Sequence, residues 1–454
     1  KRQIKIMDLE SNSNLDIEIT EVKFSDISWK SDSSGVYYNK YPKPLPENRL
    51  SQQSYDAAIY FTDISTGQEE LFYGEVNPEQ NYTVSFIGED KNILIKVVTG
   101  SEEENFYLYG SSIQSLEPIT PINEASFNYV HADNEGLFFI TNLEANNYRL
   151  VKVSFSDFQM TEVVAEQDFA LKGASFVKDY LIADYIDHAD MSSEIKFFDH
   201  SGEKLDLQLP NSLNGTISGF QSMGDDSIMF SVHSYTQPIQ YFTYDLKEDE
   251  LELVWEEIIP GFNPTDYVEI STHYESKDGT MVPITYSHKS STKLDKNTPI
   301  FLYAYGGYNI SIRPAFTPKY VAWLEMGGVL AVANIRGGGE FGKAWHNAGR
   351  LDTKQNVFDD FLYASKFLED NSIGNRKSTV ISGRSNGGLL VGTTLIQNPN
   401  YFGAALPAVG VMDMIRFTEF TEGWGWRGDY GYPILDQNDF QRNLKISPYH
   451  QTKI

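Results

Sequence analysis

A serine between two glycines is the part of this chain best suited to chemistry. Residues 383–387 read Gly-Arg-Ser-Asn-Gly, and they separate a β-branched run at 378–382 from a small-residue stretch at 388–395. The first segment predicts a short buried strand and the second predicts the start of a helix. A serine on the sharp turn between such elements has an exposed hydroxyl, as in a nucleophile elbow. Ser385 is therefore the candidate nucleophile, and acyl transfer is the candidate chemistry.

Acyl transfer also needs hydrogen-bond donors that point at the oxyanion developing on the substrate. A hydrophobic run beginning at Pro299 predicts a strand that leads into a Gly306-Gly307 turn, where α/β-hydrolases place an oxyanion loop. One candidate donor is the backbone N–H of Asn386, directly after the serine. The second is a backbone N–H of the glycine turn or the hydroxyl of Tyr305.

Together with further motifs, this pattern resembles the prolyl oligopeptidase family of serine peptidases. The motifs occur in the family's order at 303–311, 333–340, 385–388 and 429–431. The resemblance implies a serine endopeptidase that cleaves on the carboxyl side of proline through an acyl-enzyme. It makes Ser385 the nucleophile, and it makes the Tyr305 hydroxyl and the Asn386 N–H the oxyanion hole.

The same resemblance implies an aromatic pocket for the substrate proline. Trp426 is the flat wall on which the ring stacks, and Tyr308 and Tyr430 line the same pocket. A proline ring is apolar, rigid and without an N–H, so an aromatic surface selects it better than a charge does. Tyr308 stands where the family commonly has phenylalanine, so we expect a slightly more polar wall. Asp429 and Glu422 are nearby carboxylates, which leaves an arginine- or lysine-selective pocket as an alternative.

The acid and the base of the hydrolase are harder to place. In an α/β-hydrolase they follow the nucleophile, and His450 is the only histidine after Ser385. We expect His450 to be a loop residue, and Asp359 and Asp360 to cap or face a helix. The catalytic Asp and His are therefore expected outside the printed residues, in a longer enzyme. Residues 1–9 predict a strand that, by resemblance, falls inside a propeller.

Short strand pairs with polar turns recur through the first half of the chain. Each pair buries little surface alone, so radial stacking into a β-propeller is the favoured architecture, with a β-sandwich as the rival. The predicted pairs are 27–29 with 35–38, 82–86 with 92–95, 127–130 with 136–140, 175–177 with 180–183, and 217–220 with 227–230.

The strand-pair pattern ends at the Pro-Gly-Phe-Asn-Pro segment 260–264, and beyond Tyr267 strands alternate with helices. We expect a β-propeller domain at 1–262, of the seven-bladed type by resemblance and incomplete at its N-terminal side. An α/β-hydrolase peptidase domain is expected at 263–454, truncated before the acid and base segments. By resemblance the propeller caps the site, so that peptides enter and folded proteins do not.

Composition limits the partners of the protein. The 454 residues carry a net charge of −27 and no cysteine, which argues against nucleic acid or an anionic membrane and excludes disulfides and thiol catalysis. The longest apolar runs fall short of the roughly 20 residues that span a bilayer. The glycine-rich segment 336–342 lacks the ending of a phosphate loop, and the histidines lack ligand spacing. We expect a soluble monomer of cytoplasm or periplasm, without cofactor or metal.

The expected function is hydrolysis after proline in short peptides. A related oligopeptidase that cleaves after basic residues is the alternative within the enzyme class, and Asn386 and Trp426 argue against it. A non-catalytic peptide-binding protein built on the propeller is the alternative outside that class. The missing acid and base favour this second alternative, whereas the intact elbow and both oxyanion elements argue against it.

Overall fold

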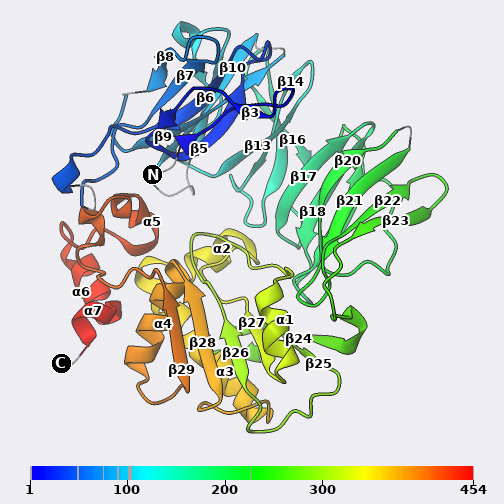
Figure 1. Ribbon diagram of the computed structural model, residues 1–454, viewed down its shortest axis with the longest axis vertical. Coiled ribbons are helices and arrows are strands. Elements are labelled where there is room, and N and C mark those ends of the chain that lie inside the picture. Colours follow the sequence, from blue (N-terminus) through cyan, green and yellow to red (C-terminus); the bar gives the residue numbers. More distant parts are fainter. Residues whose placement is uncertain are drawn as a thin grey trace.

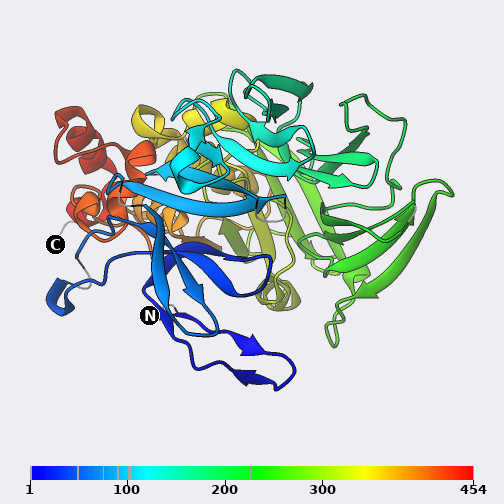
Figure 2. The same cartoon turned by 90° about the horizontal axis from the view of Figure 1, so that it is seen from above.

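A computed structural model describes residues 3–48, 51–74, 76–88, 91–100, 105–224 and 226–452. Antiparallel sheets of the first half face a mixed α/β body formed by the second half (Figure 1). Seen from above, the sheets follow one another in an arc over that body (Figure 2). The chain therefore has the predicted propeller-plus-hydrolase architecture.

Each of the five predicted strand pairs is the first hairpin of one propeller sheet. Within the described residues four of these sheets have four strands and one has three. Their strands are β5 (Val22–Trp29), β6 (Gly35–Lys40), β7 (Ala58–Asp63) and β8 (Glu69–Gly74); β9 (Gln80–Ile87), β10 (Asn92–Thr99), β11 (Asn105–Gly110) and β12 (Glu117–Pro118); β13 (Phe127–Ala132), β14 (Gly136–Thr141), β15 (Arg149–Ser154) and β16 (Met160–Val164); β17 (Leu171–Val177), β18 (Tyr180–Ile186) and β19 (Ser193–Phe198); and β20 (Thr216–Ser222), β21 (Ser227–His233), β22 (Gln240–Asp245) and β23 (Glu250–Glu256).

Alternating side chains join neighbouring sheets of the propeller. In β14, Leu137 and Phe139 pack against the preceding sheet, whereas Phe138 and Ile140 pack against the following one. Successive side chains of a strand point to opposite faces, so a strand that is apolar on both faces must lie between two other layers. This two-sided burial is why the sheets stack as blades.

The first residues correct one expectation. Residues 1–9 do not form one strand: β1 (Gln3–Ile4) and β2 (Met7–Asp8) are separate two-residue strands, and residues 1 and 2 lie outside the described ranges. β1 pairs with β4 (Ile19–Thr20) and β2 pairs with β3 (Ser13–Asn14). The expected strand is interrupted at residues 5 and 6, because β1 and β2 pair in two different sheets.

The second half is built on a six-stranded sheet in the order β24-β25-β27-β26-β28-β29. The last four strands in this order are parallel, and β24 and β25 add an antiparallel edge. The bounds are β24 (Tyr267–Glu275), β25 (Met281–Lys289), β26 (Ile300–Tyr303), β27 (Val329–Ala333), β28 (Thr379–Arg384) and β29 (Ala404–Ala408).

Helices cover both faces of this sheet. On one face Leu330 and Val332 of β27 pack with Leu324 of α1 (Pro318–Glu325). On the other face the alternate β27 residues join the core formed by α3 (Gln355–Asp370) and α4 (Asn386–Gln397). The chain passes from β26 to β27 on one side and then returns past β26 to β28. The order of the strands reverses there, and open α/β sheets bind ligands at such a point.

Contacts at both edges are among those that connect the propeller to the peptidase body. At one edge, near α5 (Arg427–Tyr430), Trp424 Nε1 donates to the carbonyl of Ser54 over 3.1 Å. At the other edge Arg313 forms an ion pair with Asp184 over 2.6 Å. The remaining helices are α2 (Gly342–Asn347), α6 (Gln437–Ile446) and α7 (Pro448–Gln451). Among the described helices, none is long and apolar enough to cross a membrane.

Candidate active site

Ser385 is the single residue between the end of β28 at Arg384 and the start of α4 at Asn386. Its backbone has φ 58° and ψ −120°. Residues other than glycine rarely adopt this conformation, which costs about 1–3 kcal/mol. A Cβ on Gly383 would lie only 2.2 Å from the carbonyl oxygen of Gly387. The turn therefore requires glycine beside it, and it leaves Ser385 exposed at the head of a buried helix.

The predicted oxyanion donors lie beside this serine. Tyr305 and Ser385 line the same cavity. Burial raises the pKa of Tyr305, and the nearby Ser385 hydroxyl opposes the shift. The phenol is therefore a neutral donor near pH 7. Asn386 is the first residue of α4, so its N–H has no acceptor within the helix. Both groups can donate to an oxygen near Ser385.

The side chain of Asn386 connects the elbow to the oxyanion loop. Its Nδ2 donates to the carbonyl of Tyr305 over 2.5 Å, and its Oδ1 accepts from the Tyr430 hydroxyl over 2.8 Å. Only 2% of Asn386 is exposed. A Cβ on Gly307 would lie 2.7 Å from Nδ2, so the loop can come this close only with glycine there.

A buried lysine, Lys354, donates hydrogen bonds to the oxyanion loop. Lys354 Nζ donates to the carbonyl of Gly306 over 3.1 Å and to Asn386 Oδ1 over 3.2 Å. It lies 3.9 Å from Oδ1 of the buried Asp429, which accepts from the N–H of Tyr308 over 3.1 Å. Sequence reasoning missed Lys354, because a lysine just before a helix gives no sign that it is buried.

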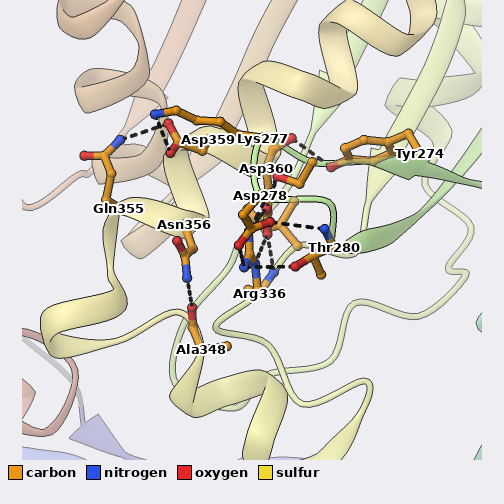
Figure 3. Close-up of polar contacts among 12 residues, drawn as sticks. Tyr274, Lys277, Asp278, Thr280, Arg336, Ala348, Gln355, Asn356, Asp359 and Asp360 are labelled. Atoms are coloured by element: carbon orange, nitrogen blue, oxygen red, sulfur yellow. Dashed lines mark hydrogen bonds and ion pairs between the residues drawn. The ribbon is translucent and has the colours of Figure 1, made fainter.

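Arg336 anchors the glycine-rich loop that follows β27 (Figure 3). Its guanidinium donates to both carboxylate oxygens of Asp360, over 2.9 and 2.6 Å, and to Asp278 over 2.5 Å. The hydrogen bond from Arg336 lowers the pKa of Asp278 to about 2. Asp360 lies inside α3 and is fully buried, so it binds Arg336 rather than capping the helix. The anchored loop packs directly against the oxyanion turn. A Cβ on Gly337 would lie only 2.6 Å from the carbonyl oxygen of Gly306.

The three predicted pocket aromatics lie together. Tyr308 and Tyr430 meet edge to face with ring centroids 5.8 Å apart. Trp426 is half-buried and stacks on Phe417 with an interplanar angle of 13°. The Tyr430 hydroxyl binds Asn386, so this residue supports the elbow as well as the pocket. Trp424, in contrast, is buried against the propeller.

The predicted site residues line one cavity of about 1010 Å³ between the two halves of the chain. Strands β9 and β10 of the propeller form much of the opposite wall. The structure thus brings together residues that the sequence placed in separate motifs, including every predicted site residue: Tyr305, Tyr308, Ser385, Asn386, Trp426 and Tyr430.

His450 is outside this group. It lies in α7 and not in a loop as expected, because Pro448 starts a helical turn after Ser447. Its Nδ1 is 2.8 Å from the Ser447 hydroxyl and 3.8 Å from Asp413 Oδ1. In the part of the chain that the structure describes, no histidine lines the cavity.

Comparison with known sequences identifies the relatives of the chain. The model of the prolyl oligopeptidase N-terminal beta-propeller domain matches residues 1–257, which is more than half of the chain. The chain belongs to the prolyl oligopeptidase family. The model described as the prolyl oligopeptidase family matches residues 314–454.

Curated members of the prolyl oligopeptidase family align over nearly all of the chain. The prolyl endopeptidase of Elizabethkingia miricola is 35% identical over 99% of this chain and 64% of its own length. The prolyl endopeptidase of Dictyostelium discoideum is 31% identical over 94% of this chain and 60% of its own length. The chain thus spans less than two thirds of these relatives.

A solved prolyl oligopeptidase has the same fold. Prolyl oligopeptidase B from Galerina marginata, bound to a 25mer macrocyclization substrate, superposes with a TM-score of 0.89 at 27% identity. The alignment covers 97% of this chain and 63% of that one.

Proposed function

We propose that this protein is a serine endopeptidase that hydrolyses peptide bonds on the carboxyl side of proline in short peptides. The observation that carries the proposal is the meeting of Ser385, the Tyr305 hydroxyl and Trp426 in one cavity. A nucleophile, an oxyanion donor and a flat aromatic wall are the parts that this reaction needs. The names of the curated relatives, prolyl endopeptidases, point to the same reaction.

The proposed reaction starts when Ser385 Oγ attacks the carbonyl carbon of the substrate proline and its proton passes to a general base. The oxyanion then accepts hydrogen bonds from the Tyr305 hydroxyl and the Asn386 N–H. Collapse of the tetrahedral intermediate expels the amine and leaves an acyl-enzyme, which water hydrolyses. We assign the base to no residue of the described ranges.

We propose that the substrate proline binds against Trp426, Tyr308 and Tyr430. The two carboxylates nearest the predicted pocket in the sequence already have partners. Asp429 accepts from the Tyr308 N–H and lies near Lys354, and Glu422 pairs with Lys23 over 2.8 Å. Their occupation supports proline over arginine as the residue before the cleaved bond.

The propeller wall supports selection by size. A cavity of about 1010 Å³ has room for a short peptide and is too small for a folded domain. We propose short proline-containing peptides as partners and a monomeric protein in cytoplasm or periplasm. The net charge of −27 supports the absence of nucleic-acid binding.

We place the domain boundary between 262 and 263. The last propeller strand, β23, ends at Glu256, and β24 enters the six-stranded sheet at Tyr267. The matched family segments, 1–257 and 314–454, support a boundary between 257 and 314. Limited proteolysis tests the placement, which predicts first cleavage between Glu256 and Tyr267.

Hydrolysis of blocked Gly-Pro and Gly-Arg anilides by the natural protein tests the proposed function. We expect turnover of the proline substrate, at least about 100-fold better kcat/KM than for arginine, and loss of turnover in Ser385→Ala. Arg384→Ala changes an exposed neighbour and serves as the matched control. A preference for arginine, or turnover that survives in Ser385→Ala, would overturn the proposal.

A further inference from the structure

Lys172 stands in the propeller wall of the cavity that contains Ser385. It is the second residue of β17, and its ammonium lies over the ring of Tyr148, 5.3 Å from the ring centroid. Within the described residues, no hydrogen bond or ion pair is found for this ammonium. The half-buried ammonium of Lys172 therefore contacts the face of an aromatic ring inside the cavity.

The ammonium also lies beside the glycine-rich loop that follows β27 in the opposite domain. A Cβ on Gly339 would be 2.8 Å from Lys172 Nζ and 2.4 Å from the carbonyl oxygen of Asn309. Asn309 directly follows Tyr308, which lines the proposed proline pocket. Lys172 therefore reaches from the propeller to the edge of the pocket in which a peptide would be held.

In the described ranges, no hydrogen bond is found between Lys172 and the charged groups near it. Glu340 Oε1 accepts from the N–H of Ile312 over 2.9 Å and from Asn334 Nδ2 over 3.1 Å, whereas its buried Oε2 has no hydrogen-bond partner. Arg313 and Asp184 form their own ion pair. Burial lowers the pKa of Lys172 to about 8, with Glu340 and Asp184 opposing the shift and Arg313 adding to it. The nearby carboxylates thus compensate only in part for the removal of the Lys172 ammonium from water.

We infer that Lys172 binds a carboxylate of a peptide held in the cavity, and that it makes the enzyme favour peptides carrying a carboxylate near the cleaved bond. The inference rests on the proposed function, because it assigns the specificity of that same site. A carboxylate would give the ammonium the charge-assisted hydrogen bonds that it lacks. The carboxylate can be the C-terminus of the leaving fragment or an acidic side chain, and separate substrate pairs distinguish the two.

The test compares peptide pairs that differ in one charge. One pair is a blocked Gly-Pro-Gly-Gly peptide with a free or an amidated C-terminus. The other pair has Glu or Gln before the proline and an amidated C-terminus. We expect kcat/KM to favour the carboxylate member of one pair by about tenfold at pH 7, and Lys172→Met to reduce that ratio to near one.

Two further variants make the result specific. Lys172→Arg keeps the charge and is expected to retain most of the ratio. Lys96→Met removes another lysine of the cavity wall and is expected to leave the ratio unchanged. The ratio should also fall as pH rises from 7 to 9, because Lys172 loses its proton in that range.

The outcomes separate this inference from the proposed function. If the natural protein cleaves none of these peptides, the proposed function fails, and binding of the same pairs to Ser385→Ala still measures the preference. A ratio near one in the unmodified protein for both pairs would overturn the inference. It would also be overturned by a ratio that Lys172→Met leaves intact, or that Lys96→Met lowers equally.

Discussion

The side-chain amide of Asn386 donates to the main-chain carbonyl of Tyr305 over 2.5 Å, and this bond joins the two elements that supply the oxyanion donors. One element is the first turn of α4, and the other is the loop after β26. The hydrogen bonds from Lys354 to Gly306 and to Asn386 join the same two elements. The donors are therefore positioned before a substrate arrives, which is the condition for strong stabilisation of an oxyanion.

Tyr305→Phe removes one oxyanion donor and keeps the ring. We expect kcat to fall about 100-fold with little change in KM, because the lost hydrogen bond strengthens only as the oxyanion forms. Steady-state kinetics on a blocked Gly-Pro anilide measure both constants. Tyr303→Phe, two residues earlier, is the matched control and should leave kcat within about twofold. A Tyr305→Phe enzyme as fast as its parent would remove Tyr305 from the oxyanion hole.

Lys354→Met removes the ammonium that lies 3.9 Å from the buried Asp429, whose other carboxylate oxygen is 3.6 Å from His346 Nε2. We expect the free energy of unfolding to fall by about 3 kcal/mol, since a buried carboxylate loses one of its charged neighbours. The double variant Lys354→Met/Asp429→Asn should recover part of this loss, and urea denaturation measures it beside the single variants Lys354→Met and Asp429→Asn. Additive losses in the double variant would show that the 3.9 Å approach of these groups contributes no coupling.

Trp426→Ala tests the proline wall. Loss of an aromatic contact of this size should raise KM for a proline substrate about tenfold to a hundredfold, with a smaller effect on kcat. Trp255→Ala is a suitable control, because Trp255 is 52% exposed on β23 of the propeller. An unchanged KM in Trp426→Ala would mean that the proline ring binds elsewhere.

Ionised Asp278 is expected to stabilise the folded protein, and this contribution is lost in acid. The hydrogen bond from Arg336 lowers its folded pKa from 3.8 to about 2, so the stabilisation is present above pH 4 and is lost as pH falls through about 2. Because the Asp278 side chain is 47% exposed, solvent screening reduces the contribution to about 1 kcal/mol. Unfolding of Asp278→Asn should differ from the parent at pH 5 and converge with it near pH 2. A constant difference across that range would contradict the assignment.

The local parts of the site were predictable from the sequence. The elbow at Ser385 is encoded by a strand, two glycines and a helix that are contiguous in the chain. The propeller hairpins were predictable for the same reason, because each strand pair is joined by a short turn. In both cases the residues that determine the conformation are close in sequence.

The buried charges were not predictable in this way. Lys354 reaches Gly306 across 48 residues, and Arg336 reaches Asp278 across 58 residues. Burial of such groups depends on which distant segments fold over them, and charged residues are usually exposed. The contact between Lys172 and the peptidase loops is of the same kind, because it exists only once the two halves face each other.

Mass-spectrometric mapping of the residue labelled by a fluorophosphonate tests the central claim most directly. The natural protein should carry one adduct, on Ser385, and labelling should slow when a blocked Gly-Pro peptide is present. The Tyr305→Phe variant should label more slowly, since the phosphonyl oxygen occupies the oxyanion site. An adduct on another serine, or no adduct in a protein that still cleaves peptides, would contradict the assignment of Ser385 as the nucleophile.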